Sequence, residues 1–173
     1  MHWPGEHPLE EAIAGFLDLV LAGRIRAWGL SNCDENELEH AVSVAGDGGV
    51  ACNQVLYHLG ERSVEHAVLP ACARHRASLV AYSPLGQGRF PGPDTEQGRA
   101  LRDIAARHDA TPHQVALAFL LRQRQVFVIP KASRVEHVER NAAAAELVLS
   151  EEDIAGVEAI FPPGPRRHGV AML

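Results

Sequence analysis

Lysine is almost absent from this sequence, because 15 of its 16 basic residues are arginine and only Lys131 is lysine. A strongly basic surface is absent as well: the net charge is −6, and the basic residues form no stripe that could neutralise a phosphate backbone. We therefore expect no nucleic-acid partner. Lys131 has two interpretations: a residue retained for its chemistry, or an isolated lysine without special meaning.

Long apolar runs are also missing. A membrane helix needs about 20 consecutive apolar residues, and the N-terminal MHWPGEHP lacks the basic region and hydrophobic core of an export signal. The three cysteines, Cys33, Cys52 and Cys72, have neither an even count nor the spacing of metal ligands. Cys52 and His58 are best interpreted as packing and strand-end residues. We expect no membrane span, no metal site and a reducing cytoplasm.

Helices are predicted where apolar residues recur at helical spacing and capping residues precede them. Residues 9–22 have this spacing and end at Gly23. The others begin at recognisable caps: Asp34 with Glu37, Thr111 with Pro112 and Gln114, and Ser150 with Asp153. Pro70 cannot donate an internal helical hydrogen bond, so a helix in that region should begin near it.

Strands are predicted in four short runs rich in β-branched and aromatic residues, at 24–30, 50–57, 78–82 and 126–130. Strands that alternate with helices are typical of parallel α/β folds, and polar residues follow the end of each strand here, as in a (β/α)8 barrel. A doubly wound sheet would have a glycine-rich G-x-G-x-x-G turn, which is absent. A complete barrel needs about 250 residues, so we expect a partial barrel whose missing units lie upstream.

Seven sequence stretches carry a family resemblance: MHWPG, GRIRAWGLSN, NQVLYH, VAYSPLGQG, TPHQVALAFLL, VIPKAS and RNAAAAELVLSEED. In this order they resemble the C-terminal part of the aldo-keto reductases. The residues within the stretches are most similar to those of the bacterial methylglyoxal-reductase-like members. The resemblance implies an α/β fold, a partial (β/α)8 TIM barrel containing strands from about the fourth or fifth to the eighth. It covers 1–173 as one barrel segment, with 162–173 as a short tail that could cover the site.

The resemblance also implies an activity and a site. Family members reduce aldehydes and ketones to alcohols with NADPH, so it implies NADPH (NADP+) as cofactor and a small carbonyl compound as substrate. His2 matches the histidine of a catalytic group whose aspartate, tyrosine and lysine have no counterpart in this chain. The positions implied to bind the cofactor are Ser31, Asn32 and Gln54 for the carboxamide, Tyr82 for the nicotinamide ring, Ser83, Leu85 and Gly86 for the pyrophosphate, Lys131, Ser133 and Arg134 for the 2′-phosphate, and Asn141 for adenine.

Two positions depart from the family pattern, and several have plainer interpretations. His137 stands where many relatives have arginine or glutamine, and Arg140 where a glutamate often precedes the asparagine. His2 can also be an ordinary chain-end residue. In the same way, residues 31–32 can simply lead into the next helix, and residues 82–86 can be a core aromatic followed by a turn.

Several functional hypotheses follow. In the leading one, the chain is a truncated NADPH-dependent aldo-keto reductase that is inactive alone, because it lacks the tyrosine acid. One alternative is a non-catalytic NADP(H)-binding or partner-binding module. Another is a half-barrel that self-associates through its open strand edges. Outside the family, the chain would be a phosphate-binding α/β domain.

Overall fold

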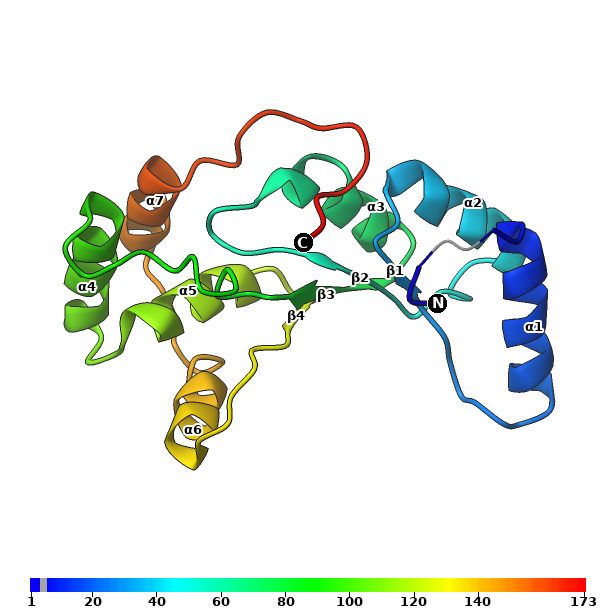
Figure 1. The fold of residues 1–173 in the computed structure, drawn as a ribbon, viewed down its shortest axis with the longest axis horizontal. Helices are drawn as coiled ribbons and strands as arrows, with labels where there is room; N and C mark the ends of the chain where they lie inside the picture. The colour runs from blue at the N-terminus through cyan, green and yellow to red at the C-terminus, as the bar shows by residue number, and fades with distance from the viewer. Residues whose placement is uncertain (4–5) are drawn as a thin grey trace. The chain divides into compact units, whose positions relative to one another are not determined.

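A computed structural model describes residues 1–3 and 6–173 of the chain. Its four strands are hydrogen-bonded neighbours in chain order, β1-β2-β3-β4, and helices separate them along the chain (Figure 1). The strands are β1 (Leu30–Ser31), β2 (Cys52–Leu56), β3 (Ser78–Tyr82) and β4 (Val126–Val128). The helices are α1 (Leu9–Leu21), α2 (Glu35–Ala45), the 3-10 helix η1 (Ser63–His66), α3 (Val68–Arg74), α4 (Glu96–Arg107), α5 (Pro112–Leu121), α6 (Val135–Ala143) and α7 (Glu151–Ile160).

The predicted helix starts are confirmed. Reciprocal side-chain and backbone hydrogen bonds form complete capping boxes at the N-termini of α2, α5 and α7, with Asp34, Thr111 and Ser150 as the capping residues. Helix α1 ends as expected, because Gly23 follows it at a φ of 66° and donates to the Val20 carbonyl at 2.9 Å. Helix α3 begins two residues before Pro70, which therefore lies in its first turn.

Three of the four predicted strands are confirmed with small changes at their ends, but the prediction for residues 24–30 is wrong over most of its length. Only Leu30 of that run is in β1. The Gly29 carbonyl accepts a hydrogen bond from the N-terminal ammonium of Met1 at 2.6 Å. Trp28 is buried and stacks on Phe16 of α1, with the ring centroids 5.2 Å apart. The β-forming residues of this run therefore serve packing rather than strand pairing.

Two helices were not predicted from the sequence, α4 and α6. In α4 only Leu101, Ile104 and two small residues are buried, and α6 buries no residue. Both helices contain few large apolar residues, so the sequence interpretation missed them. The Thr95 hydroxyl accepts from the Gly98 N–H at 3.0 Å, and this cap was the available signal for α4.

The described chain forms two compact units. The first comprises residues 1–56, 63–80 and 165–173, and the second comprises residues 57–62 and 81–164. In the first unit, α2 contacts both α1 and α3, and Ile13, Leu38, Val55 and Leu79 are fully buried. Residues 165–173 contain no helix or strand, and Arg166 pairs with Glu35 of α2 at 2.8 Å.

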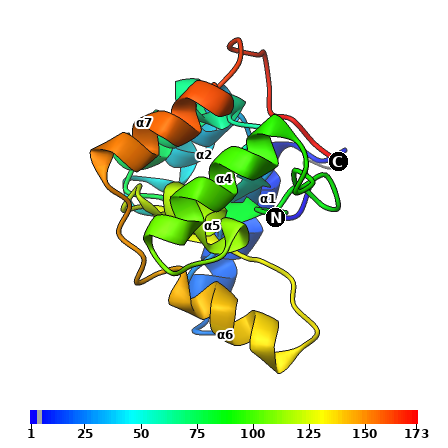
Figure 2. The same ribbon diagram turned by 90° about the vertical axis from the view of Figure 1, so that its left-hand side faces the viewer.

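The second unit is built around α5. Six consecutive α5 residues, Val115–Leu120, are buried, and α5 contacts α4, α6 and β4. Figure 2 shows α4 between α5 and α7, with α6 on the other side of α5. A helix buried nearly all round gains roughly 1.5–3 kcal/mol from each large apolar side chain. Helix α5 is therefore the main packing element of this unit.

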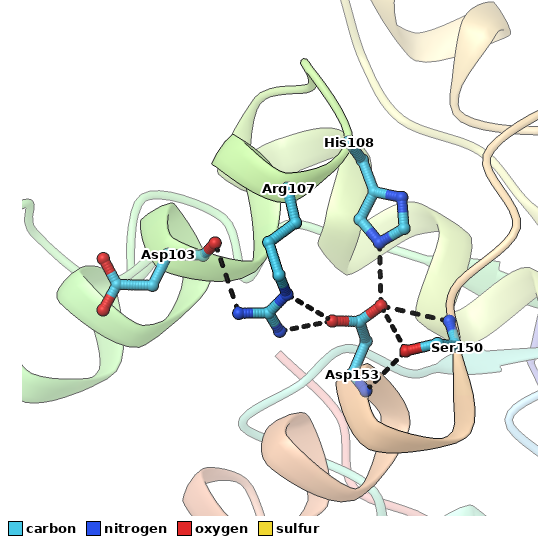
Figure 3. A network of polar contacts seen from close by, with 5 residues as sticks. All are labelled: Asp103, Arg107, His108, Ser150 and Asp153. Atoms are coloured by element: carbon cyan, nitrogen blue, oxygen red, sulfur yellow. Dashed lines mark hydrogen bonds and ion pairs between the residues drawn. The ribbon is translucent and has the colours of Figure 1, made fainter.

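A polar cluster joins α7 to the end of α4 in the second unit (Figure 3). The Asp153 side chain is only 3% exposed. Its carboxylate accepts hydrogen bonds from the Ser150 hydroxyl at 2.7 Å and from the Arg107 guanidinium, and it lies 2.7 Å from His108 Nε2. Burial acts to raise the pKa of Asp153, but the hydrogen bonds from Ser150, Arg107 and His108 outweigh it and hold the pKa well below its usual range. The contacts of the cluster therefore favour the ionised form of Asp153.

Candidate cofactor site

The predicted carboxamide-binding residues of the first unit lie together at the ends of two neighbouring strands. Strand β1 pairs with β2 in parallel, and Ser31 is in register with Gln54. The Ser31 hydroxyl donates to the Gln54 carbonyl at 2.9 Å and lies 3.2 Å from the donating Asn32 side-chain nitrogen. The Asn32 N–H also donates to the Gln54 carbonyl, at 2.8 Å. These contacts hold hydroxyl and amide groups at one strand end, where a carboxamide could be recognised.

Asn53 fixes this strand end, and the sequence interpretation missed it. Its side chain is completely buried and its Nδ2 donates to the Cys33 carbonyl at 2.7 Å. Because Cys33 follows Asn32 directly, this bond constrains the turn in which Asn32 has a φ of 57°. The Asn53 Oδ1 has no hydrogen-bond partner among the described residues. Its position beside Gln54 in the sequence was the only signal for this role.

The loop after β3 in the second unit has an unusual backbone. Ser83, Gly86, Gln87 and Gly88 all have φ values between 48° and 83°. The Gly86 N–H donates to the Ser83 carbonyl at 2.8 Å, and the Arg89 N–H to the Gly86 carbonyl at 3.0 Å, so the loop is made of consecutive tight turns. Left-handed conformations at Ser83 and Gln87 cost on the order of 1–3 kcal/mol each. Backbone of this kind can present N–H groups to an anion.

Two adjoining cavities begin at this loop. One, of about 490 Å³, is lined by residues of the loop together with Pro130 and Lys131. The other, of about 270 Å³, shares Leu85 and Lys131 with it. Its remaining lining residues are Thr111, His113, Gln114, His137, Arg140 and Asn141. The two cavities are thus lined by four of the predicted cofactor-binding residues, Ser83, Leu85, Lys131 and Asn141.

The two positions that depart from the family pattern, His137 and Arg140, both line the second cavity. The sequence interpretation missed its other histidine, His113, whose ring stacks on Phe90 with the centroids 4.1 Å apart. Burial and then the nearby His137 lower the pKa of His113. The cavity therefore combines two cationic groups, Lys131 and Arg140, with imidazole and amide groups.

Not every predicted residue lies in a cavity. Ser133 and Arg134 are exposed and line none of the described cavities, although Arg134 reaches Glu136 at 3.8 Å. Tyr82 is half-buried at the end of β3, and its carbonyl accepts from the Tyr57 N–H at 3.5 Å.

His2 is exposed, and its only described contact is with the Trp3 ring, at 5.2 Å between centroids. Its neighbours Pro4 and Gly5 in the MHWPG stretch lie outside the described residues. His2 lines none of the described cavities. A catalytic role for His2 stays a prediction.

His58 lies at the end of β2, as interpreted from the sequence. Its Nδ1 accepts a hydrogen bond from the Gly60 N–H at 3.1 Å, and burial lowers its pKa. Among residues 1–3 and 6–173, no group of three or more His, Cys, Asp or Glu side chains is placed to hold a metal ion. No helix in the same residues combines the length and apolar character needed to cross a membrane.

Comparison with known proteins gives the class of this chain. The model of the aldo/keto reductase family matches residues 1–161, so the chain belongs to the aldo/keto reductase family. Among curated relatives, methylglyoxal reductase YeaE of Escherichia coli K12 is 36% identical over 173 residues, covering 100% of this chain and 61% of that protein. Pyridoxine 4-dehydrogenase of the same organism is 33% identical over an alignment that covers 92% of this chain and 53% of that protein.

Solved structures agree with this assignment. An aldo-keto reductase from Klebsiella pneumoniae, in complex with NADPH, superimposes with a TM-score of 0.89 at 38% identity, covering 100% of this chain and 61% of that one. The thermostable aldo-keto reductase Tm1743, in complex with the inhibitor epalrestat, gives a TM-score of 0.85 at 39% identity. The match covers 92% of this chain and 58% of that one. The four parallel strands and their helices thus correspond to part of the barrel of these enzymes, which confirms the predicted fold class. The chain spans about 60% of their length.

Proposed function

We propose that this chain binds NADP(H) and forms the cofactor-binding part of an aldo-keto reductase that reduces aldehydes and ketones to alcohols. The observation that carries the proposal is the pair of adjoining cavities in the second unit, where Lys131, Arg140 and Asn141 converge beside the turn-rich loop after β3. Cationic groups suit a phosphate monoester, and an amide suits the edge of adenine. Solved relatives that carry NADPH or NADP support the same choice of cofactor.

The chemistry of the residues fits this cofactor. Two cavities that share Leu85 and Lys131 suit an elongated ligand with a pyrophosphate at one end and a phosphorylated nucleoside at the other. In this proposal, NADPH when bound supplies the hydride for carbonyl reduction. The loop of residues 83–88 orients the pyrophosphate through backbone N–H groups, and Lys131 holds the 2′-phosphate by charge.

The first unit contributes to the proposal separately. Its Ser31, Asn32 and Gln54 cluster offers donors and acceptors for the carboxamide, and Tyr82 of the second unit offers an aromatic face for the nicotinamide ring. By family resemblance, His2 hydrogen-bonds the carbonyl oxygen of a small substrate such as methylglyoxal. Because no residue of this chain matches the family tyrosine, and a positioned general acid contributes about 10² to 10⁴ in rate, we expect binding without measurable turnover.

A fluorescence titration tests the binding proposal directly. The 173-residue chain should bind NADPH, and Lys131→Gln should weaken binding by about 10- to 100-fold, since a charge-assisted hydrogen bond contributes about 1.5–3 kcal/mol. Arg124→Gln removes an exposed charge outside both cavities and is the matched control. Equal NADPH affinity in wild type and Lys131→Gln would refute the assignment. NADPH oxidation with methylglyoxal at the rate of an ordinary reductase would refute the expected lack of turnover.

A second candidate function, self-association, has an observation of its own. A groove of about 400 Å³ lies between β4 and α6 and is lined largely by apolar residues, including Phe127 and Val138, which are 58% and 54% exposed. We propose a second copy of this chain as its occupant, because the groove adjoins the terminal strand of the sheet and such an edge can pair with another strand. In sedimentation velocity, Phe127→Glu should abolish a dimer and Val148→Glu, at an 83% exposed position, should not. A monomeric wild-type chain at high concentration would reject this candidate.

A further inference from the structure

Glu136, in the first turn of α6, pairs with two arginines, of which Arg140 lines the smaller of the two adjoining cavities. Its Oε1 is 2.6 Å from Arg140 Nη2, and its Oε2 is 3.8 Å from Arg134 Nη2. One carboxylate therefore engages both guanidinium groups, with one oxygen toward each. Arg140 lines the cavity, and Arg134 is a position that the family resemblance implies for the 2′-phosphate.

Both ion pairs are open to water. The side chains of Glu136 and Arg140 are 52% and 53% exposed, and that of Arg134 is 70% exposed. Exposed pairs are weak and exchange readily, so they do not lock the arginines in place. Lys131, by contrast, has no carboxylate partner among the described residues. The two arginines are therefore already partly neutralised by an internal anion, whereas Lys131, which lines the cavity with Arg140, is not.

We infer that Glu136 is a specificity-determining residue that competes with the phosphate of the ligand for Arg134 and Arg140. The inference rests on the proposed function. A phosphate monoester carries more negative charge than a carboxylate and accepts bidentate hydrogen bonds from arginine, so it can displace Glu136. The displaced carboxylate remains close to the bound phosphate and repels it. Glu136 therefore lowers affinity for a dinucleotide with a 2′-phosphate and has little effect on one without it.

Glu136→Gln is the direct test, because it keeps the size of the side chain and removes its charge. Two unit charges about 4 Å apart in water interact by an amount that corresponds to roughly fivefold in affinity. We therefore expect Glu136→Gln to strengthen NADPH binding by about threefold to tenfold and to change NADH binding by less than about twofold. The gain should shrink as salt concentration rises.

The matched control is Glu139→Gln, which removes an exposed negative charge from the same helix, where no described cation pairs with it. It should leave both affinities unchanged. The gain from Glu136→Gln should also shrink when it is measured in an Arg140→Gln background, because one of the two arginines for which Glu136 competes is then absent. Circular dichroism of each variant checks that its helices are retained.

The outcomes separate this inference from the proposed function. If the wild-type chain binds both NADPH and NADH but Glu136→Gln leaves NADPH affinity unchanged, the inference is wrong and the proposed function stands. Weaker NADPH binding in Glu136→Gln would also overturn it, because Glu136 would then be orienting the arginines for the ligand. A wild-type chain that binds neither dinucleotide overturns the proposed function, and the inference with it.

Discussion

Asp153→Asn should destabilise the second unit far more than an ordinary surface substitution. Asp153 is 3% exposed, and its carboxylate accepts from the backbone and hydroxyl of Ser150 at 3.1 and 2.7 Å and from Arg107 (Figure 3). The asparagine has nearly the same shape, but it has no charge and replaces one acceptor oxygen with a donor nitrogen. The substitution therefore tests the charge of this cluster rather than its packing.

The magnitude follows from the contacts that are lost. A hydrogen bond to a charged group contributes about 1.5–3 kcal/mol, and one arm of a capping box about 0.5–1 kcal/mol. Because the arginine side of the cluster is half exposed and screened by water, we take the lower part of this range, about 2–3 kcal/mol. For a chain of this size that lowers Tm by roughly 4–12 °C.

The effect should depend on pH in a defined direction. The folded protein holds the pKa of Asp153 below its usual range, so this contribution is fully present above the ordinary carboxyl pKa of about 4. It is lost as the pH falls from there toward the lowered pKa of the folded state. The stability difference between wild type and Asp153→Asn should therefore be largest near neutral pH and shrink below about pH 4.

Urea denaturation followed by circular dichroism at pH 7 and at low pH measures both effects. Glu151→Gln is the control, because it makes the same chemical change at an exposed position in the first turn of α7. If Asp153→Asn unfolds within about 0.5 kcal/mol of wild type at pH 7, as neutral surface substitutions do, the cluster does not stabilise the fold as argued. A difference that grows on acidification would refute the direction of the pKa shift.

Three further predictions concern other parts of the chain. Thr111→Ala removes the hydroxyl that accepts from the Gln114 N–H and should cost about 1 kcal/mol in urea denaturation, whereas Thr111→Ser should cost less. Cys33 and Cys72 have pKa values raised to about 12, chiefly by burial, so a thiol reagent at pH 8 should label them only after unfolding. Rapid labelling of the native chain at either thiol would contradict this. Arg62→Met should destabilise the protein by about 2–4 kcal/mol, because Arg62 is 3% exposed and donates to the Phe161 carbonyl at 2.5 Å. A loss of stability below about 0.5 kcal/mol would show that this buried hydrogen bond does not stabilise the fold.

The fold was predictable where short-range chemistry decides it. A capping box needs only residues three positions apart, which is why the starts of α2, α5 and α7 follow directly from the sequence. Strands β2 to β4 were predictable from their β-branched residues. Residues 24–29 failed because Trp28 packs on Phe16 and Gly29 bonds the N-terminus, and both partners are distant in the sequence. Helices α4 and α6 were missed because they contain few large apolar residues and bury few residues or none.

For the candidate site, too, some features follow from the sequence and others only from the tertiary structure. The sequence by itself determined the family, the partial barrel and the residue types at the strand ends, because these are properties of ordered local motifs. Only the tertiary structure decided that His137 and Arg140 line the same cavity as Lys131 and that His113 joins them, because cavity walls are built from α5, α6 and loops that the chain order does not place together. It also decided that Asn53 anchors the turn at Asn32, since a buried side chain finds its hydrogen-bond partner only when the strands pair.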